Sequence, residues 1–210
     1  MSKPSFAQSE RAALCDLLLE VGPEAPTLCQ GWQAADLAAH LVLRERRPDA
    51  AAGILGGPLR RYTERTQRSI RDGRSWPELV GLVRSGPPAL LRPIDEPVNT
   101  VEYFVHHEDV RRAAPDPAPP RPLDPALEAV LWRRLRGLAI LARRRVPVGL
   151  TLSAPGYGSL TVRAGTPMVT LRGAPGELLL FMTGRQQAAV VEPDGPADAV
   201  RRVQEARLGL

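Results

Sequence analysis

The sequence predicts the fold class α plus a small α+β part, a helical bundle followed by a short domain that contains strands. Up to Val146, apolar residues recur mainly at helical spacing, which is typical of amphipathic helices. Beyond that point, apolar and polar residues alternate as in half-buried strands, over 148–153, 158–163 and 168–172. We therefore expect two domains, 1–146 and 147–210.

Four substantial helices are expected in the first domain, over 5–21, 33–47, 100–114 and 124–145. Residues suited to an N-cap precede three of them, with Asn99 or Thr100 expected at the third. Shorter helices are expected over 59–72 and 76–84, and a stiff proline-rich connector over 115–122. Four such helices suggest a bundle, an architecture that commonly builds metal sites from inward-facing side chains.

The second domain should add helices to its strands. An apolar run over 178–182 follows a proline and precedes a glycine, which favours a short helix. We expect a last strand over 188–192 and a final amphipathic helix over 197–208.

The composition disfavours some functions. The net charge of +5 and pI near 10 suggest nucleic-acid binding, but Lys3 is the only lysine and acidic residues are interspersed throughout. No apolar run reaches the roughly 18 residues of a membrane span, and the N-terminal residues lack a signal-peptide pattern. We expect a cytoplasmic protein. Cys15 and Cys29 fit no zinc-ligand spacing and are expected to be mostly buried thiols.

The stretch 99–112 carries polar groups on a face that should be buried. It contains two of the three histidines, and on a helix Glu102, His106 and Asp109 share the apolar face. We expect Glu108, Arg111 and Arg112 to point away from this apolar face. Buried ionisable groups need partners, and a divalent metal is one candidate.

His40 offers a third ligand from another helix, where it also lies on the apolar side. With Glu102 and His106 it would supply two nitrogens and one oxygen, the ligand set of an open zinc or other divalent site. The open position would accept a substrate or an activated water. The alternative is that these histidines are satisfied core or surface residues.

Three neighbouring residues have two expected roles each. Asp36 could cap its helix or hydrogen-bond the His40 imidazole. Asp109 could orient His106 or form a buried ion pair with an arginine such as Arg44. His107 points about 100° from His106, toward the polar side, and is expected to be a supporting or surface residue.

Two segments together form a recognisable motif: Trp32-Gln-Ala-Ala-Asp36-Leu-Ala-Ala-His40-Leu and Glu102-Tyr-Phe-Val-His106-His-Glu-Asp109. It resembles the DinB-like superfamily, and within it the mycothiol-dependent maleylpyruvate isomerase group, typical of actinobacteria. The segment Gly173-Ala-Pro-Gly-Glu-Leu-Leu-Leu-Phe-Met-Thr-Gly-Arg185 resembles that group's second domain, a sterol-carrier-like α+β unit. The resemblance covers most of the chain, although 49–95 match only as helices and loops.

The resemblance implies a four-helix DinB-like bundle with a divalent metal, usually zinc, held by His40, Glu102 and His106. It also implies mycothiol as a cosubstrate whose thiol the metal converts to a thiolate nucleophile. In an isomerase, that thiolate would add to the substrate double bond, allow rotation and leave. Arg185 would be a candidate anion clamp for the thiol or a substrate carboxylate, with a structural role as the alternative.

Three classes of function follow from these observations. The first is a thiol-dependent isomerase or transferase, with a small-molecule thiol and a substrate as partners. The second is a sensory or structural metal-binding protein without turnover, and the third, which we disfavour, is a basic nucleic-acid binder. The sequence names neither the substrate, the metal nor the oligomeric state.

Overall fold

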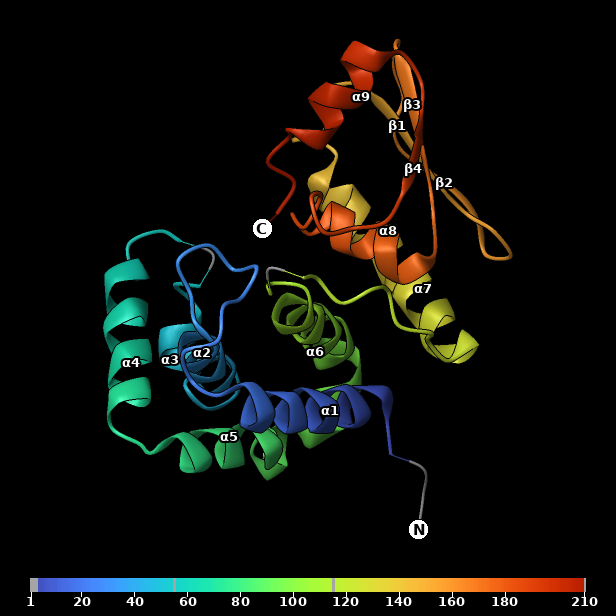
Figure 1. Ribbon diagram of the computed structural model, residues 1–210. Coiled ribbons are helices and arrows are strands. Elements are labelled where there is room, and N and C mark those ends of the chain that lie inside the picture. Colours follow the sequence, from blue (N-terminus) through green and yellow to red (C-terminus); the bar gives the residue numbers. More distant parts are fainter. Residues whose placement is uncertain (1–3, 55, 115, 210) are drawn as a thin grey trace. The chain divides into compact units, whose positions relative to one another are not determined.

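The computed structural model describes residues 4–54, 56–114 and 116–209, and the chain divides into two compact units, Met1–Pro119 and Pro120–Leu210 (Figure 1). The first unit is helical and the second combines helices with a small sheet, as the sequence predicts. None of the helices in these described ranges is long and apolar enough to cross a membrane. Pro115, the first residue of the predicted connector, lies outside them.

The first unit consists of helices joined by short loops. Helix α1 packs against α6 and α5, and α2 packs against α4, α5 and the short α3. The described elements are α1 (Phe6–Val21), α2 (Ala34–Arg46), α3 (Pro48–Ala51), α4 (Arg60–Asp72), α5 (Trp76–Arg84), the 3-10 helix η1 (Ala89–Ile94) and α6 (Asp95–Arg111).

Local sequence signals explain where most of these helices begin. The Ser5 side chain accepts a hydrogen bond from the Gln8 backbone N–H, and the Gln8 side chain bonds back to Ser5, which is a capping box for α1. Ser75 and Glu78 form another at α5. Gly22 ends α1 with a positive φ of 84°, a conformation that favours glycine.

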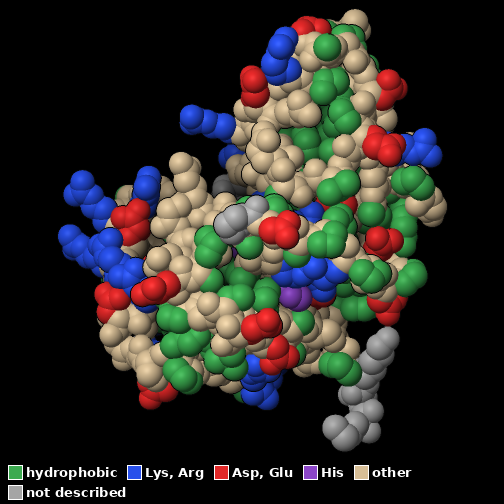
Figure 2. All heavy atoms as spheres, viewed as in Figure 1, with side chains coloured by type: hydrophobic (Ala, Val, Ile, Leu, Met, Phe, Trp, Pro, Cys, Tyr) green, Lys and Arg blue, Asp and Glu red, His purple; other side chains and the backbone are tan. Residues whose placement is uncertain are grey.

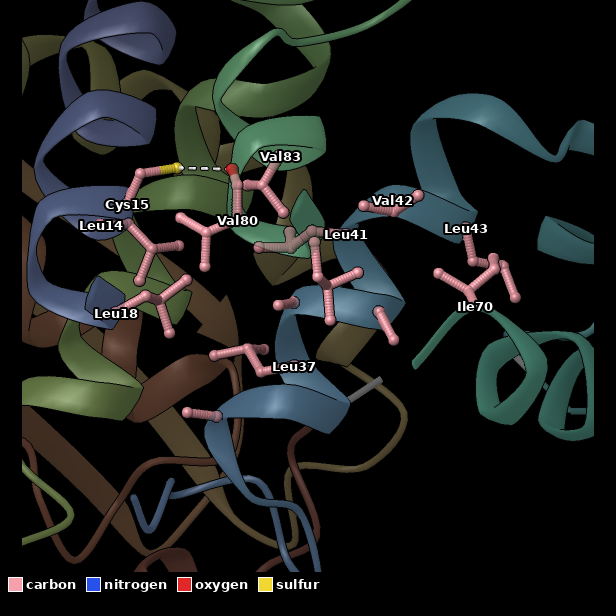
Figure 3. Close-up of a cluster of buried hydrophobic side chains, with 14 of the residues drawn as sticks. Leu14, Cys15, Leu18, Leu37, Leu41, Val42, Leu43, Ile70, Val80 and Val83 are labelled. Atoms are coloured by element: carbon pink, nitrogen blue, oxygen red, sulfur yellow. Dashed lines mark hydrogen bonds between the residues drawn. The ribbon is translucent and has the colours of Figure 1, made fainter. Parts of the chain in front are cut away.

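The apolar core of this unit combines residues of α1, α2, α4 and α5, labelled in Figure 3, with Ala50 of α3 and with Tyr103 and Val110 of α6. Leucine, valine and alanine dominate it, which fits the low aromatic content. Cys15 belongs to this core, with its thiol 3.9 Å from the Val80 carbonyl oxygen. The prediction of a buried thiol is therefore confirmed for Cys15.

Helix α6 begins earlier than the sequence predicts. It starts at Asp95, directly after η1, so that Asn99 and Thr100 lie inside the helix rather than at its cap. Both are buried. The Asn99 amide donates hydrogen bonds to Asp95 and Glu45, which explains how a typical cap residue is tolerated within the helix.

The second unit holds a four-stranded sheet in the order β2-β1-β3-β4. The β1 strand pairs antiparallel with β2 and parallel with β3, and β4 closes the sheet antiparallel to β3. Its elements are α7 (Pro125–Ala142), β1 (Gly149–Ala154), β2 (Gly158–Arg163), β3 (Met168–Arg172), α8 (Pro175–Met182), β4 (Glu192–Asp194) and α9 (Ala197–Gln204).

Two expectations for this part of the chain need correction. Strand β4 begins at Glu192, where the predicted strand over 188–192 ends, and part of the preceding segment forms turns closed by bonds from the Ala188 and Ala189 N–H groups to the Arg185 carbonyl. Helix α7 packs against α8 and β2, so it groups with the sheet rather than with the preceding helices. The division between units therefore lies at Pro119/Pro120 and not at 146/147.

Candidate metal centre

Helices α2 and α6 bring together the three side chains that the sequence singles out. His40 Nε2 lies 3.3 Å from Glu102 Oε1, and His106 Nε2 lies 3.2 Å from the same oxygen. One ligand atom from each of the three residues lies within 4.8 Å of the others. Glu102 and His106 are one turn apart on α6, so the rigid helix fixes their separation.

These distances fit a divalent ion. Zinc bonds of about 2.0–2.1 Å at tetrahedral angles place two nitrogen or oxygen ligands about 3.3 Å apart. The two separations involving Glu102 match that spacing, 3.3 and 3.2 Å. Two imidazoles and one carboxylate form the ligand set of an open site, which leaves a coordination position for an added ligand.

Asp109 holds His106 in the orientation that metal binding requires. Its Oδ2 lies 2.8 Å from His106 Nδ1, and the carboxylate is fully buried. A proton held on Nδ1 directs the lone pair of Nε2 toward Glu102 and His40. The structure therefore places the Asp109 carboxylate against the His106 imidazole, the contact that the orienting role requires.

Arg44 contacts the Glu102 carboxylate. Its Nε lies 3.3 Å from Glu102 Oε1, and its Nη1 donates to Asn99 Oδ1. Its side chain is about a quarter exposed, at 23%. A cation beside Glu102 offsets part of the carboxylate's negative charge, which leaves a divalent ion less fully neutralised by its own ligands.

Burial and hydrogen bonding shift the protonation of all three candidate ligands. Burial lowers the pKa of His40, so its imidazole is neutral and ready to bind an ion. Burial would raise the pKa of Glu102, but hydrogen bonds with His106 and His40 outweigh it and hold that pKa well below its ordinary value.

His106 shows the opposite balance. Burial would lower its pKa, yet hydrogen bonds with Asp109, Cys29 and Glu102 raise that pKa well above its ordinary value. A raised pKa means that this imidazole holds a proton more firmly, so an ion bound to it would compete with that proton.

Cys29 is a member of the site that the sequence did not predict. Its Sγ lies 3.2 Å from Asp109 Oδ2 and 3.9 Å from His106 Nδ1, and these three residues form a second group whose ligand atoms lie within 4.8 Å of one another. The residue comes from the loop before α2, so no regular ligand spacing relates it to α6.

The environment of His107 corrects another expectation. It is buried rather than on a polar face, with its Nδ1 3.3 Å from Glu10 Oε2 on α1. Glu108 and Arg112 are buried as well, and their side chains pair with each other at 2.6 Å. Because other parts of the unit cover α6 on several sides, helical periodicity alone could not identify one buried face.

Histidine accordingly shows only as a small patch on the face in Figure 2. The relative exposures of His40, His106 and His107 are 6%, 7% and 7%.

Two further predicted residues flank His40. Asp36 caps α2, since its Oδ2 accepts a hydrogen bond from the Gln33 backbone N–H, and its Oδ1 pairs with Arg71 at 2.7 Å. The capping role predicted for Asp36 is therefore the one seen. Trp32 packs beside His40, with ring centroids 5.0 Å apart.

Arg185 lies in the second unit, in the turn that follows α8. Its guanidinium Nη1 donates to the Thr183 carbonyl oxygen at 2.6 Å, and its backbone N–H bonds to the Leu180 carbonyl. These contacts stabilise the end of α8. Its predicted role as an anion clamp stays a prediction.

Comparison with protein-family models, curated proteins and solved structures finds no match for this chain.

Proposed function

We propose that this chain is a divalent-metal-binding protein of the DinB-like type, with its metal held by His40, Glu102 and His106. The convergence of the three side chains carries the proposal, because two imidazole nitrogens lie 3.3 and 3.2 Å from one carboxylate oxygen. Zinc fits this donor set best, since it favours imidazole and carboxylate ligands at tetrahedral angles.

We further propose the activity of the mycothiol-dependent maleylpyruvate isomerase type, a thiol-dependent isomerase or transferase. The charge balance supports it. Glu102 supplies one negative charge to a divalent ion, and Arg44 beside it adds a positive one. A centre with excess positive charge favours an anionic added ligand, and a thiolate is such a ligand.

The residues of the chain have separate tasks in this proposal. Bound zinc would supply Lewis acidity and lower the pKa of a thiol beside it. His40 and His106 hold it from two helices, and Asp109 keeps the His106 proton on Nδ1 so that Nε2 faces inward. Arg44 fixes the Glu102 carboxylate. In the second unit, Arg185 is a separate candidate for binding an anion.

Metal analysis of the purified chain tests the centre. We expect stoichiometric zinc in the wild type and in His107→Gln, a matched control because His107 is a buried neighbour that contacts Glu10 instead. His40→Ala and Glu102→Ala, each combined with Cys29→Ser so that no nearby thiolate can hold zinc, should lose most of the metal. Stoichiometric metal in both of these variants would end the proposal.

Calorimetric titration with mycothiol tests the proposed activity separately. The zinc-loaded wild type should bind the thiol, and the metal-free wild type should bind it at least about tenfold more weakly, because the thiolate would lose its metal. Equal binding with and without zinc would leave a metal protein that does not use the thiol.

A further inference from the structure

The region on the far side of the His106 ring contains a second set of metal donors. The first set faces His106 Nε2, whereas Cys29 Sγ and Asp109 Oδ2 lie 3.9 and 2.8 Å from Nδ1. Thiolate, carboxylate and imidazole together suit zinc and softer thiophilic ions such as cadmium. We propose that Cys29, Asp109 and His106 Nδ1 form a second position for a thiophilic divalent ion, bridged to the first by the His106 imidazole.

The distances are close to those that such an ion needs. Tetrahedral zinc with a sulfur bond of about 2.3 Å separates the sulfur from a nitrogen or oxygen ligand by about 3.5 Å. The Cys29 sulfur lies 3.2 Å from the Asp109 oxygen and 3.9 Å from the His106 nitrogen, on either side of that value. The Asp109–His106 separation of 2.8 Å must widen by about 0.5 Å.

The structure fixes the donors in place from several directions. Thr27 Oγ1 accepts a hydrogen bond from the Cys29 backbone N–H and donates one to the Trp32 carbonyl, which holds the loop. The Leu28 backbone N–H donates to the Asp109 carbonyl at 3.0 Å, which ties the loop to α6. Preorganised donors reduce the cost of ordering that a metal site otherwise carries.

The charges also suit a buried ion. A thiolate from Cys29 and the carboxylate of Asp109 together neutralise a divalent cation, and Asp109 is fully buried. The first position has one ligand carboxylate and a neighbouring arginine, so it stays positively charged and open to an added anion. The two positions therefore differ in net charge: the second is neutral when filled, and the first stays positive.

Filling the second position changes the protonation of its ligands. Cys29 gives up its thiol proton and His106 gives up its Nδ1 proton, both to water, and the sulfur and the nitrogen bind the ion in place of those protons. With the first position also filled, the His106 ring would be an imidazolate bridging both ions. With the second position empty, the Asp109–His106 hydrogen bond orients the ring as described above.

Cobalt titration of the metal-free full chain distinguishes the two positions. Cobalt bound to sulfur gives a near-ultraviolet charge-transfer band, whereas cobalt bound to nitrogen and oxygen ligands gives only visible bands. We expect the wild type to show the near-ultraviolet band and to bind two equivalents of ion. Cys29→Ser should lose the band and bind one equivalent, and Cys15→Ser, the control at the other cysteine, should keep both.

Glu102→Gln separates this inference from the proposed function. If the second position exists, this variant loses the visible signal of the first position and keeps the charge-transfer band. A wild type with visible bands that depend on Glu102 and no charge-transfer band overturns the second position and leaves the proposed function intact. A band that depends on Cys29, with no binding that depends on Glu102, supports the second position and removes the first.

Alkylation of the wild type gives a test that requires no variant to fold. Iodoacetamide labelling, followed by peptide mass spectrometry, should modify Cys29 in the metal-free chain at least about tenfold faster than in the cadmium-loaded chain, since a metal-bound thiolate is a poor nucleophile. Equal labelling rates would overturn the second position.

Discussion

Two of the polar clusters along α6 differ in where their arginine lies, between the carboxylates in one and at the edge in the other. In the first, Arg11 forms ion pairs with Asp95 and Glu45 at 2.5 and 2.9 Å, and both carboxylates are buried. In the second, Glu102 and Asp109 face the nitrogens of His106, with Arg44 at the edge. Both clusters place polar groups in the interior, yet they point to different roles.

The difference shows how a structural cluster can be told from a candidate metal centre. The Arg11 guanidinium occupies the space between its two carboxylates and stacks 4.5 Å from the Tyr103 ring centroid, so no ion is needed there. In the other cluster the donor atoms converge at spacings that suit an ion.

The largest effect should come from removing the internal cation. Arg11→Met leaves Asp95 and Glu45 buried without their partner, and we expect a loss of about 3–5 kcal/mol in the free energy of unfolding. Urea denaturation followed by circular dichroism measures it. The matched control is Arg84→Met, which removes a surface ion pair with Asp16, about 1 kcal/mol at most. Equal losses in the two variants would refute the structural role of the Arg11 cluster.

The sequence predicts the converging side chains better than their surroundings. His40, Glu102 and His106 could be found because helical periodicity puts Glu102 and His106 one turn apart and puts His40 on the apolar side of another helix. The role of Arg11 could not, because its partners Glu45 and Asp95 come from other helices whose packing has no local signal. Cys29 was missed for the same reason, since a loop residue has no periodicity.

In the fold, too, the sequence predicts local elements better than it predicts how they pack. The predicted strands β1, β2 and β3 match the structure within a residue or two, because alternation and turn residues are local signals. The placement of α7 with the sheet depends on contacts with α8 and β2, which only the tertiary structure reveals.

The second largest effect should come from Glu102→Gln, and it should depend on metal. At a zinc concentration one hundred times the dissociation constant, binding stabilises the wild type by about 2.7 kcal/mol. Measured in a Cys29→Ser background, the variant should lose nearly all of that increment, whatever its metal-free stability. Urea denaturation with zinc and with a chelator separates these terms. A variant that zinc still stabilises fully would show that the two clusters do not differ in metal dependence.

Asp109→Asn should have an intermediate effect, a loss of zinc affinity. The amide cannot hold the Nδ1 proton of His106 as firmly as the carboxylate does, so zinc affinity should fall about 10–100-fold. Competition with a zinc chelator measures the affinity. Asp36→Asn is the control, because Asp36 caps α2 and pairs with Arg71. If Asp36→Asn weakens zinc binding as much as Asp109→Asn, the orienting role of Asp109 is wrong.

The smallest effect should appear as a difference in acid sensitivity at the Arg11 cluster. Burial alone would raise the pKa of Asp95, but hydrogen bonds from Arg11 and Asn99 outweigh burial and lower that pKa. A lowered pKa in the folded state means that the unfolded chain takes up the proton first. The stability from Asp95 is therefore present above the unfolded pKa of about 3.9 and is lost as the pH falls through the folded value.

Urea unfolding midpoints measured between about pH 5 and pH 3 test this pH dependence. At an unchanged m-value, the midpoint falls in proportion to the free energy of unfolding. The wild type should lose stability more steeply below about pH 3.9 than Asp95→Asn, which has no proton to bind there. Asp16→Asn, at a carboxylate whose side chain is 73% exposed, should keep the wild-type slope. A wild-type slope no steeper than that of Asp95→Asn would mean that Arg11 does not hold Asp95 ionised, and the contrast between the two clusters would lose its electrostatic basis.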